Sequence, residues 1–271
     1  MAGPLAGKRA LVTGASSGIG KAIAVDLARR GADLVISARR ADRLNALAAT
    51  LTAEHGVKVD VVPLDLADPT APAALFAATV GQGTQIDILI NNAGFGVYEP
   101  FEDVAWETHA QVIQLNLVAL THLCHLFVPH MRAAGTPCHI MNVASIAAFQ
   151  PTPFYTVYGP TKSFVRDFTE ALDYELRDTN VRAICVCPGG THTEFADVAG
   201  IKLQKHHEAA MMSAEQCAAI GVEAMLRGRR LVVTGFINKL ACWLLRFVPR
   251  RAMPLLAHKT LGDPVKQLPA G

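Results

Sequence analysis

The chain has 271 residues, of which 51% are hydrophobic and 18% are charged, and its formal net charge is +2. This composition allows a large buried core, and it excludes a disordered chain and a strongly basic nucleic-acid-binding protein. Six cysteines without regular spacing exclude a disulfide framework, and no cluster of residues has the spacing of a metal site.

Short apolar strands alternate with helices up to about residue 234. In chain order we predict strand 9–13, helix 19–30, strand 33–37, helix 41–55, strand 57–64, helix 67–80, strand 86–90, helix 105–131, strand 138–143, helix 158–177, strand 181–187, helix 214–227 and strand 230–234. Asp68 is the expected cap of helix 67–80, with Pro69 in its first turn. The alternation predicts one α/β domain, a doubly wound Rossmann-type fold with a mostly parallel sheet of about seven strands and helices on both faces.

A glycine-rich turn joins the first predicted strand to the first predicted helix. Gly14 permits a tight turn, Gly18 allows close backbone approach, and Gly20 lets helix and strand pack together. Ser16 and Ser17 add hydroxyl donors, and the N-terminus of the helix favours a pyrophosphate. The strand–turn–helix context favours a dinucleotide-binding loop over a plain glycine-rich turn.

The end of the second predicted strand distinguishes between the two nicotinamide cofactors. Folds that bind NAD carry an acidic residue there for the ribose 2′-hydroxyl. This chain instead has Ala38 followed by Arg39 and Arg40, and two guanidinium groups suit a 2′-phosphate. We therefore expect NADP (NADPH), with Arg39 as the main contact; the alternative is that both arginines are solvated at a helix start.

Three side chains suited to acid–base chemistry follow the strand 138–143. Tyr158 and Lys162 lie one turn apart on one face of a predicted helix, and Ser145 lies upstream. A phenol has a pKa of about 10, and a nearby ammonium group favours its ionised form. The three residues predict proton transfer at an oxygen whose carbon gains or loses a hydride, although the Tyr–Lys spacing alone also fits an exposed helix pair.

Taken together, these motifs make the chain similar to the short-chain dehydrogenase/reductase family over about residues 8–234. Segments 13–20, 65–66 and 91–94 match the family's cofactor loop, its adenine contact and its ribose-contacting segment. The resemblance implies Ser145, Tyr158 and Lys162 as catalytic residues, with Asn116 holding a proton-relay water through a helix distortion. The cofactor-binding residues implied by the resemblance and the motifs are Gly14, Ser16, Ser17, Gly18, Ile19, Gly20, Arg39, Arg40, Asp65, Leu66, Asn92, Ala93, Gly94, Tyr158, Lys162, Pro188, Gly189, Thr191 and Thr193.

The resemblance implies an NADP(H)-dependent oxidoreductase that interconverts a carbonyl and a secondary alcohol. In the implied mechanism the cofactor transfers hydride, Tyr158 is the acid or base, Ser145 orients the carbonyl, and Lys162 binds the nicotinamide ribose. The chain departs from the family pattern at Gly159-Pro160 and at Thr191. Proline is tolerated in a first helical turn, so we expect the helix to begin near Tyr158.

The segment after the last predicted strand lies outside the common fold. We expect residues 1–235 to form the oxidoreductase domain and residues 236–271 to form an apolar and basic C-terminal helical extension. Between Arg227 and Lys259 there are eight Lys or Arg residues and no Asp or Glu. This composition suits an interfacial helix on an anionic membrane, and a helix over the substrate cleft or in a dimer interface are the alternatives. All three bring apolar surface to the open side of the fold, so we expect an apolar or lipid-like substrate.

The sequence also leads to expectations about substrate contacts, assembly and cellular location. Substrate contacts are expected from 95–101, 149–154 and 194–212, which follow strand ends. A non-catalytic protein of this fold that senses NADP(H) or binds a membrane surface is the competing interpretation. The resemblance implies a homodimer or homotetramer through the two long helices. Residues 1–7 do not resemble a signal peptide and no run of about 18 apolar residues predicts a spanning helix, so we expect a cytoplasmic protein, with membrane contact through the tail as the alternative.

Overall fold

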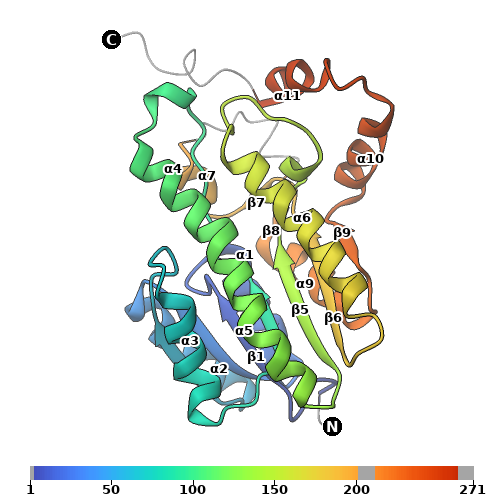
Figure 1. Cartoon of the computed structure of the whole chain (residues 1–271). Coiled ribbons are helices and arrows are strands. Elements are labelled where there is room, and N and C mark those ends of the chain that lie inside the picture. Colours follow the sequence, from blue (N-terminus) through green and yellow to red (C-terminus); the bar gives the residue numbers. More distant parts are fainter. Residues whose placement is uncertain (1–2, 201–210, 262–271) are drawn as a thin grey trace.

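The computed structural model describes residues 3–200 and 211–261, and its centre is one seven-stranded sheet (Figure 1). Neighbouring strands all run parallel, in the order β3-β2-β1-β4-β5-β6-β9. The strands are β1 Arg9–Thr13, β2 Asp33–Ala38, β3 Val59–Pro63, β4 Ile88–Asn91, β5 Cys138–Val143, β6 Val181–Cys187 and β9 Leu231–Val233. The predicted doubly wound sheet of about seven strands is therefore confirmed.

Helices cover both faces of the sheet and enclose two hydrophobic cores. One core involves α1 Gly18–Arg29, α2 Ala41–His55 and α9 Ala214–Leu226, and the helices of the other face are α3 Ala71–Thr79, α4 Trp106–Ile113, α5 Leu120–Ala133 and α6 Tyr158–Glu175. Side chains alternate along a strand, so Val12 of β1 packs in the first core and Leu11 in the second. Burial on both faces explains why the strands are continuous apolar runs.

The strand order reverses beside β1. The chain moves outward from β1 through β2 to β3, and then returns to β4 on the other side of β1. In a doubly wound sheet, ligands bind in the crevice outside the carboxyl ends of the strands at such a reversal. The loops after β1 and β4 therefore mark where a site is expected.

The segment Trp106–Ala133 combines α4, a π-helical turn over Gln114–Ala119, and α5. The segment has 28 residues and contains an 18-residue window with a mean hydropathy of 1.5, so by length and composition it could cross a membrane, which we did not expect from the sequence. Leu123, Phe127 and Met131 of this segment are buried in the second core. The segment is therefore a core helix of the α/β fold.

The prediction for helix 67–80 is wrong at its N-terminal end. The helix α3 begins at Ala71, after a turn in which Asp68 accepts hydrogen bonds from the backbone N–H and the hydroxyl of Thr70, at 2.8 and 2.7 Å. Asp68 closes this turn instead of capping the helix, so Pro69 lies before the helix and Thr70 is the N-cap residue.

A second, two-stranded parallel sheet was not predicted. It pairs β7 Thr191–His192 with β8 Met212–Ser213, and the short helix α7 Phe195–Val198 follows β7. The Ser213 hydroxyl accepts from the Gln216 N–H at 3.1 Å, and the Gln216 side chain accepts from the Ser213 N–H at 3.3 Å. This reciprocal capping box begins α9.

Two helices form the tail of the described chain. They are α10 Phe236–Leu244 and α11 Met253–Leu261, and Pro249 lies between them. Both lie outside the layers of sheet and helices, near the N-terminal end of α6 and the end of β9 (Figure 1). Residues 262–271 of the predicted extension lie outside the described residues.

All six cysteines are free and buried. Burial raises the pKa of the Cys124 thiol to about 12 and that of the Cys242 thiol to about 11. These thiols therefore stay protonated near neutral pH and behave as small core side chains.

Candidate functional site

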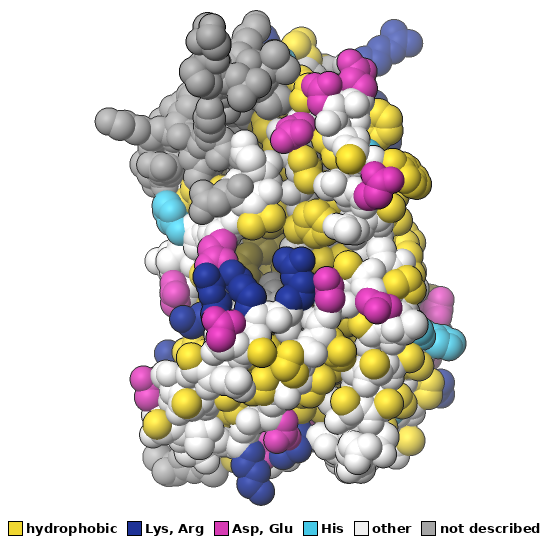
Figure 2. Space-filling model, turned by 90° about the vertical axis from the view of Figure 1, so that its left-hand side faces the viewer, with side chains coloured by type: hydrophobic (Ala, Val, Ile, Leu, Met, Phe, Trp, Pro, Cys, Tyr) yellow, Lys and Arg dark blue, Asp and Glu magenta, His cyan; other side chains and the backbone are white. Residues whose placement is uncertain are grey.

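A cavity of about 670 Å³ opens at the carboxyl ends of the parallel strands. Figure 2 shows a hollow with apolar side chains inside it and with Lys or Arg side chains gathered at its mouth. Every predicted catalytic or cofactor-binding residue lines the cavity except Gly20 and Asn116, which lie behind it against Gly14 and Gly94. The structure thus brings residues from far apart in the sequence to one cleft.

The loop after β1 has the backbone shape that its glycines predict. Gly14 and Gly18 have φ angles of +67° and +54°, in the left-handed region that favours glycine. A Cβ on Gly20 would lie 2.3 Å from the carbonyl oxygen of Gly14, so no larger residue fits where α1 meets the loop. Together with the N-terminus of α1, this backbone offers a close approach to a pyrophosphate.

Basic side chains at the start of α2 reach this loop. Nη2 of Arg40 donates to the hydroxyls of Ser16 and Ser17 at 3.1 and 2.8 Å. Nη1 of Arg40 donates to Glu194 at 2.8 Å, and Arg43 pairs with the other carboxylate oxygen. Hydrogen bonds from the two arginines lower the pKa of Glu194 to about 2, so this carboxylate is ionised at neutral pH.

The remaining residues expected to surround the adenosine lie beside this cluster. Arg39, Asp65 and Leu66 line the cavity next to Ala38. Arg39 is exposed, and among the residues that the structure describes it has no ion-pair partner, so its guanidinium can meet an anion. The last residue of β2 is Ala38, so no carboxylate is present at the usual position for a ribose 2′-hydroxyl.

The loop after β4 is tied to the end of β1. The backbone N–H groups of Asn92 and Ala93 both donate to the Thr13 hydroxyl, at 3.0 and 3.1 Å, and the Asn92 side chain donates to the Thr13 carbonyl at 3.0 Å. A Cβ on Gly94 would lie 2.9 Å from Oδ1 of Asn116. The segment therefore lines the cavity with backbone, and its glycine lets the chain pass close to Asn116.

Ser145, Tyr158 and Lys162 meet at one wall of the cavity. Ser145 follows β5, and its side chain hydrogen-bonds the Tyr158 hydroxyl. Tyr158 is the first residue of α6, as expected from Pro160, and Lys162 lies one turn later. Nζ of Lys162 donates to the carbonyl of Val143 at 2.9 Å and lies 5.7 Å from the centroid of the Tyr158 ring.

Burial changes the proton affinities of the tyrosine and the lysine. Desolvation raises the pKa of Tyr158 to about 12, against the opposing effect of the hydrogen bond with Ser145. Desolvation also lowers the pKa of Lys162 to about 8. We expected the ammonium group to favour the phenolate, but burial raises the pKa of Tyr158, and the phenol is protonated at neutral pH.

Asn116 lies in the π-helical turn, so the helix distortion expected from the sequence is present. Its Nδ2 donates to the carbonyl of Phe95 at 2.9 Å and to the hydroxyl of Thr161 at 3.2 Å. Its Oδ1 accepts from the Phe95 N–H at 3.1 Å. Asn116 thus fixes the loop after β4 and the start of α6 relative to each other.

Aromatic side chains surround the tyrosine. The ring centroids of Tyr155 and Phe195 lie 4.7 and 5.4 Å from that of Tyr158, and Tyr98 lies 5.0 Å from Tyr155. Leu261 of α11 packs against this group. The cavity therefore has an apolar end, which is closed in part by the tail.

Some of the predicted substrate contacts line this apolar end and others were missed. Phe95, Gln150, Thr152, Phe195, Ala196, Val198 and Met211 lie in the predicted ranges, whereas 201–210 lie outside the described residues. Tyr155 was not among the predicted substrate contacts, although its position three residues before Tyr158 can be seen in the sequence. Asn238 and Leu261 also line the cavity, but they reach it through packing of the tail and have no local signal.

The turn after β6 carries Pro188, Gly189, Thr191 and Thr193, which all line the cavity. A Cβ on Gly189 would lie 2.0 Å from Nδ2 of Asn238, so α10 rests directly on this turn. The hydroxyl of Thr191 donates to the Gly189 carbonyl at 3.0 Å. The substitution of threonine for an apolar residue at position 191 thus adds a bond within the turn.

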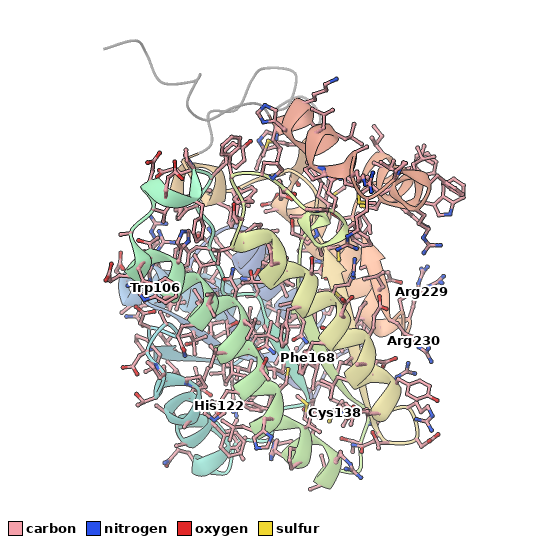
Figure 3. All side chains as sticks on the ribbon, turned by 45° about the horizontal axis from the view of Figure 1, so that its top comes forward. Trp106, His122, Cys138, Phe168, Arg229 and Arg230 are labelled. Carbon is pink, nitrogen blue, oxygen red and sulfur yellow. The ribbon has the colours of Figure 1, made fainter. Side chains whose placement is uncertain are left out.

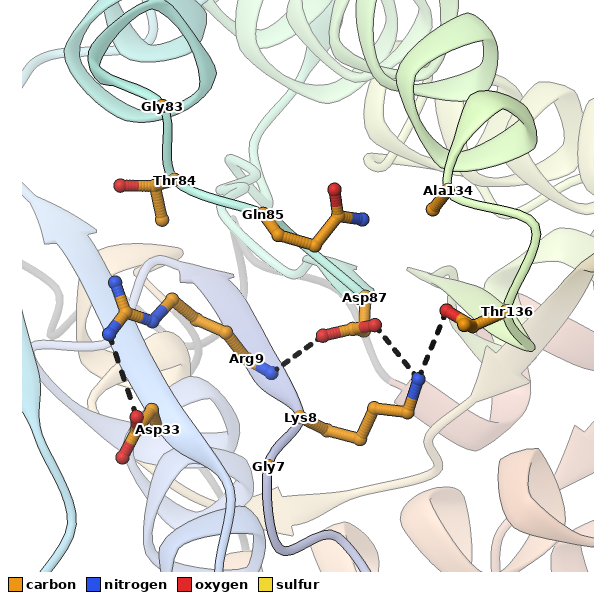
Figure 4. A pocket seen from close by; sticks show the side chains of 10 residues that line it. All are labelled: Gly7, Lys8, Arg9, Asp33, Gly83, Thr84, Gln85, Asp87, Ala134 and Thr136. Carbon is orange, nitrogen blue, oxygen red and sulfur yellow. Dashed lines mark hydrogen bonds and ion pairs between the residues drawn. The ribbon is translucent and has the colours of Figure 1, made fainter.

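A second hollow, of about 560 Å³, lies at the amino ends of the strands, on the opposite side of the sheet from the cleft at their carboxyl ends (Figure 4). Nζ of Lys8 donates to Asp87 at 2.9 Å and to Thr136 at 3.2 Å, and Asp87 also accepts from the Arg9 N–H at 2.9 Å. Arg9 in turn pairs with Asp33 at 3.5 Å. These contacts join β1 to β4, and within the described part of the chain the charged side chains that line the hollow are all paired.

The glycine-rich loop after β1 and the meeting of Ser145, Tyr158 and Lys162 in one cleft agree with the family to which sequence comparison assigns the chain. The family model for short chain dehydrogenases matches residues 8–204. The chain belongs to the short-chain dehydrogenase family. As a short-chain dehydrogenase it is an oxidoreductase that acts on alcohol or carbonyl groups.

Individual members of the family are similar over most of this short-chain dehydrogenase. The 1-deoxy-11-beta-hydroxypentalenate dehydrogenase of Streptomyces exfoliatus is 36% identical over 188 residues, which are 69% of this chain and 68% of that protein. A short-chain dehydrogenase from Sphingobium yanoikuyae, solved in complex with NADPH, is 32% identical with a TM-score of 0.78, covering 90% of this chain and 97% of that one. A short-chain dehydrogenase/reductase from Burkholderia phymatum, solved with NAD, is 26% identical with a TM-score of 0.80, covering 89% and 93%.

The two solved relatives hold different nicotinamide cofactors. Family membership therefore does not choose between NADP and NAD, and the choice depends on the side chains at the end of β2. The cavity itself fits a dinucleotide, because glycine backbone, serine hydroxyls and a helix N-terminus lie at one end and Tyr158 lies at the other.

Proposed function

We propose that this short-chain dehydrogenase uses NADPH to reduce the carbonyl group of an apolar compound to a secondary alcohol, with Tyr158 as the proton donor. The observation that carries the proposal is the meeting of Ser145, Tyr158 and Lys162 in a cavity whose other end is lined by Arg39 and Arg40. Oxidation of the alcohol uses the same residues in reverse.

The proposed role of Tyr158 is to protonate the carbonyl oxygen. With a pKa of about 12 the phenol holds its proton at neutral pH and can donate it as the oxygen gains negative charge. The Ser145 side chain hydrogen-bonds the same phenol, so it can hold the oxygen within reach and stabilise its charge. A bound nicotinamide cofactor supplies the hydride. The high pKa favours reduction at neutral pH, because oxidation needs the phenolate as a base.

Lys162 and Asn116 are proposed to return a proton to the tyrosine. A pKa of about 8 lets Lys162 hold and release a proton near neutral pH. Gly94 lies between the two side chains, since a Cβ there would be 3.3 Å from Nζ of Lys162 and 2.9 Å from Oδ1 of Asn116. Because both side chains pack closely against this one glycine, Lys162 and Asn116 lie near enough to each other to support a water-mediated relay from Tyr158 past Lys162 to Asn116.

The preference for NADPH is inferred from charge. The cation pair Arg39–Arg40, the Ser16 and Ser17 hydroxyls and the absence of a carboxylate at the end of β2 all favour a 2′-phosphate. We expect Arg39 to contribute more than Arg40 to binding of the 2′-phosphate, because Arg40 already binds the two serines and Glu194.

The substrate class is inferred from the apolar end of the cavity. Its walls there are formed mainly by Phe95, Tyr155, Phe195, Val198 and Leu261. Such a lining favours a hydrophobic carbonyl compound, with the reacting oxygen directed to Ser145 and Tyr158.

A homodimer or homotetramer remains our prediction for the assembled protein. The outer surface of α4 to α6 presents Trp106, Val118 and Phe164 to solvent, and Figure 3 shows Trp106 at the edge of the molecule. Apolar side chains on adjacent long helices favour a contact between copies of the chain.

Cofactor binding tests the proposal directly. Calorimetric titration should give tighter binding of NADPH than of NADH, and Arg39→Ala should remove most of that preference; Arg29→Ala, an arginine outside the cleft, is the matched control. Tyr158→Phe should bind NADPH normally but fail to reduce hydrophobic ketones. Equal affinity for both cofactors would contradict the arginine argument. NADPH binding without turnover of any carbonyl or alcohol would favour a sensor instead of an enzyme.

A further inference from the structure

The tail helices turn a large apolar face to solvent. Phe236, Ile237 and Phe247 are 79%, 77% and 70% exposed. The exposed apolar residues of α10, of the 3-10 turn Leu245–Phe247 after it and of α11 are together called the tail face: Phe236, Ile237, Leu240, Trp243, Leu244, Phe247, Leu255 and Leu256. Single exposed apolar residues are ordinary, but a group of this size marks an interaction surface.

The orientation of α10 is fixed by polar and buried groups on its inner side. At 100° per residue, its exposed apolar residues span an arc of about 120°, and Asn238 and Cys242 lie on the opposite side. Nδ2 of Asn238 donates to the carbonyl of Thr234 at 2.9 Å, and the side chain fills the space above Gly189. The helix therefore keeps its polar asparagine inside and its apolar arc outside, the reverse of a helix that packs on its own core.

The charge around the tail face is of one sign. Lys239, Arg246, Arg250 and Arg251 have no ion-pair partner among the described residues, and there is no acidic residue from 227 to 259. Arg229 and Arg230 project on the same side of the molecule as α10 (Figure 3), and Arg230 pairs with the buried Asp173 at 3.1 Å. Packing two copies of this face together would bring these cations against one another, whereas an anionic surface neutralises them.

We propose that the tail face docks on an anionic phospholipid bilayer. Its aromatic and leucine side chains enter the headgroup region, and the unpaired Lys and Arg side chains bind lipid phosphates. Asn238, Thr260 and Leu261 line the cavity, so docking sets the cavity beside the bilayer. This last consequence rests on the proposed apolar substrate, but docking itself rests only on the tail face and its charges.

The test is co-sedimentation of the full chain with vesicles. Vesicles of phosphatidylglycerol mixed with phosphatidylcholine should bind the protein, vesicles of phosphatidylcholine alone should bind it weakly, and binding should weaken as salt rises from about 0.1 to about 1 M. Trp243→Ser combined with Phe247→Ser should lower the partition coefficient by about tenfold or more. Replacing Lys239, Arg246, Arg250 and Arg251 with glutamine should remove the preference for anionic vesicles. Trp106→Ser, which removes a ring on α4 that is 67% exposed against 49% for Trp243, is the control and should bind as the wild type does.

Two results would overturn the proposal. One is wild-type protein that stays in the supernatant with anionic vesicles while it binds NADPH normally. The other is a change from dimer to monomer in Trp243→Ser/Phe247→Ser, seen by sedimentation velocity, without any vesicle binding of the wild type, which would make a second copy of the chain the occupant of the tail face. NADPH affinity, measured on the same preparations, separates failure of docking from failure of the proposed enzymatic function.

Discussion

Replacing Glu194 with glutamine should raise the affinity for NADPH and leave that for NADH unchanged. The Glu194 carboxylate accepts hydrogen bonds from Arg40 and Arg43, and Arg40 also binds the hydroxyls of Ser16 and Ser17. A 2′-phosphate bound by Arg40 would have to share that guanidinium with the carboxylate or displace it. NADH has no 2′-phosphate, so it would not meet this competition.

The expected gain is small because the pairs are solvated. Glu194 and Arg40 side chains are 45% and 39% exposed, so the low pKa of the carboxylate overstates how strongly the pair is held. An exposed ion pair contributes about 0.2–1 kcal/mol, so removing the pair between Glu194 and Arg40 should lower the Kd for NADPH by about 1.5- to fivefold. Glutamine keeps the size and one acceptor oxygen, which limits any other change.

Titration of both cofactors into wild type, Glu194→Gln and Glu215→Gln would measure this effect, and the gain should shrink at high salt. Glu215 is an exposed glutamate in the first turn of α9 and does not line the cavity, so it controls for net charge. An equal gain for NADPH and NADH would refute the reasoning. Weaker NADPH binding in Glu194→Gln would also refute it, because it would mean that the carboxylate holds Arg40 in its binding position.

Burial and packing lead to three other expectations. Lys162→Met should abolish turnover but raise the thermal midpoint near neutral pH, since lowering the lysine pKa from 10.5 to about 8 opposes folding by up to about 3 kcal/mol. At Lys162 the unfolded chain holds more protons than the folded one between those values, so the stability advantage of Lys162→Met over wild type should shrink from pH 8 to 10.5 in denaturant titrations, and a constant difference would contradict this. Gly189→Ala should cost about 1–3 kcal/mol in thermal melts, and adding Asn238→Ala should recover most of it. Gln150→Leu should raise kcat/KM for ketones without hydroxyl groups relative to hydroxylated ones, because Oε1 of Gln150 is buried in the cavity wall without a partner; an unchanged ratio would exclude this role.

Local signals predicted much of the fold. The bounds of β5 and β6 agree with the predicted ranges, because each is an apolar run between turn residues. The start of α6 at Tyr158 follows from Pro160, which fits best in the first turn of a helix. The start of α3 was wrong, because an aspartate before a helix can close a turn as readily as it can cap the helix.

Long-range features of the site could not be predicted from the sequence. The contact of Glu194 with Arg40 joins residues 154 positions apart, and only the folded chain brings them together. The pKa values of Tyr158 and Lys162 depend on how completely the cavity wall buries them, which no spacing reveals. The amphipathic pattern of α10 is visible in the sequence, but which side faces outward depends on the contact between Asn238 and Gly189.

The buried cysteines can report how often different parts of the protein open. A thiol reagent reaches a covered sulfur only when the surrounding structure opens. Cys242 lies on the inner side of α10, so the rate at which its thiol is modified measures how often the tail separates from the rest of the molecule. Cys185 and Cys187 lie in β6, between β5 and β9, and become accessible only when this part of the sheet comes apart. The ratio of the two rates would tell whether the tail opens as an independent unit, and how a bound vesicle or cofactor changes that motion.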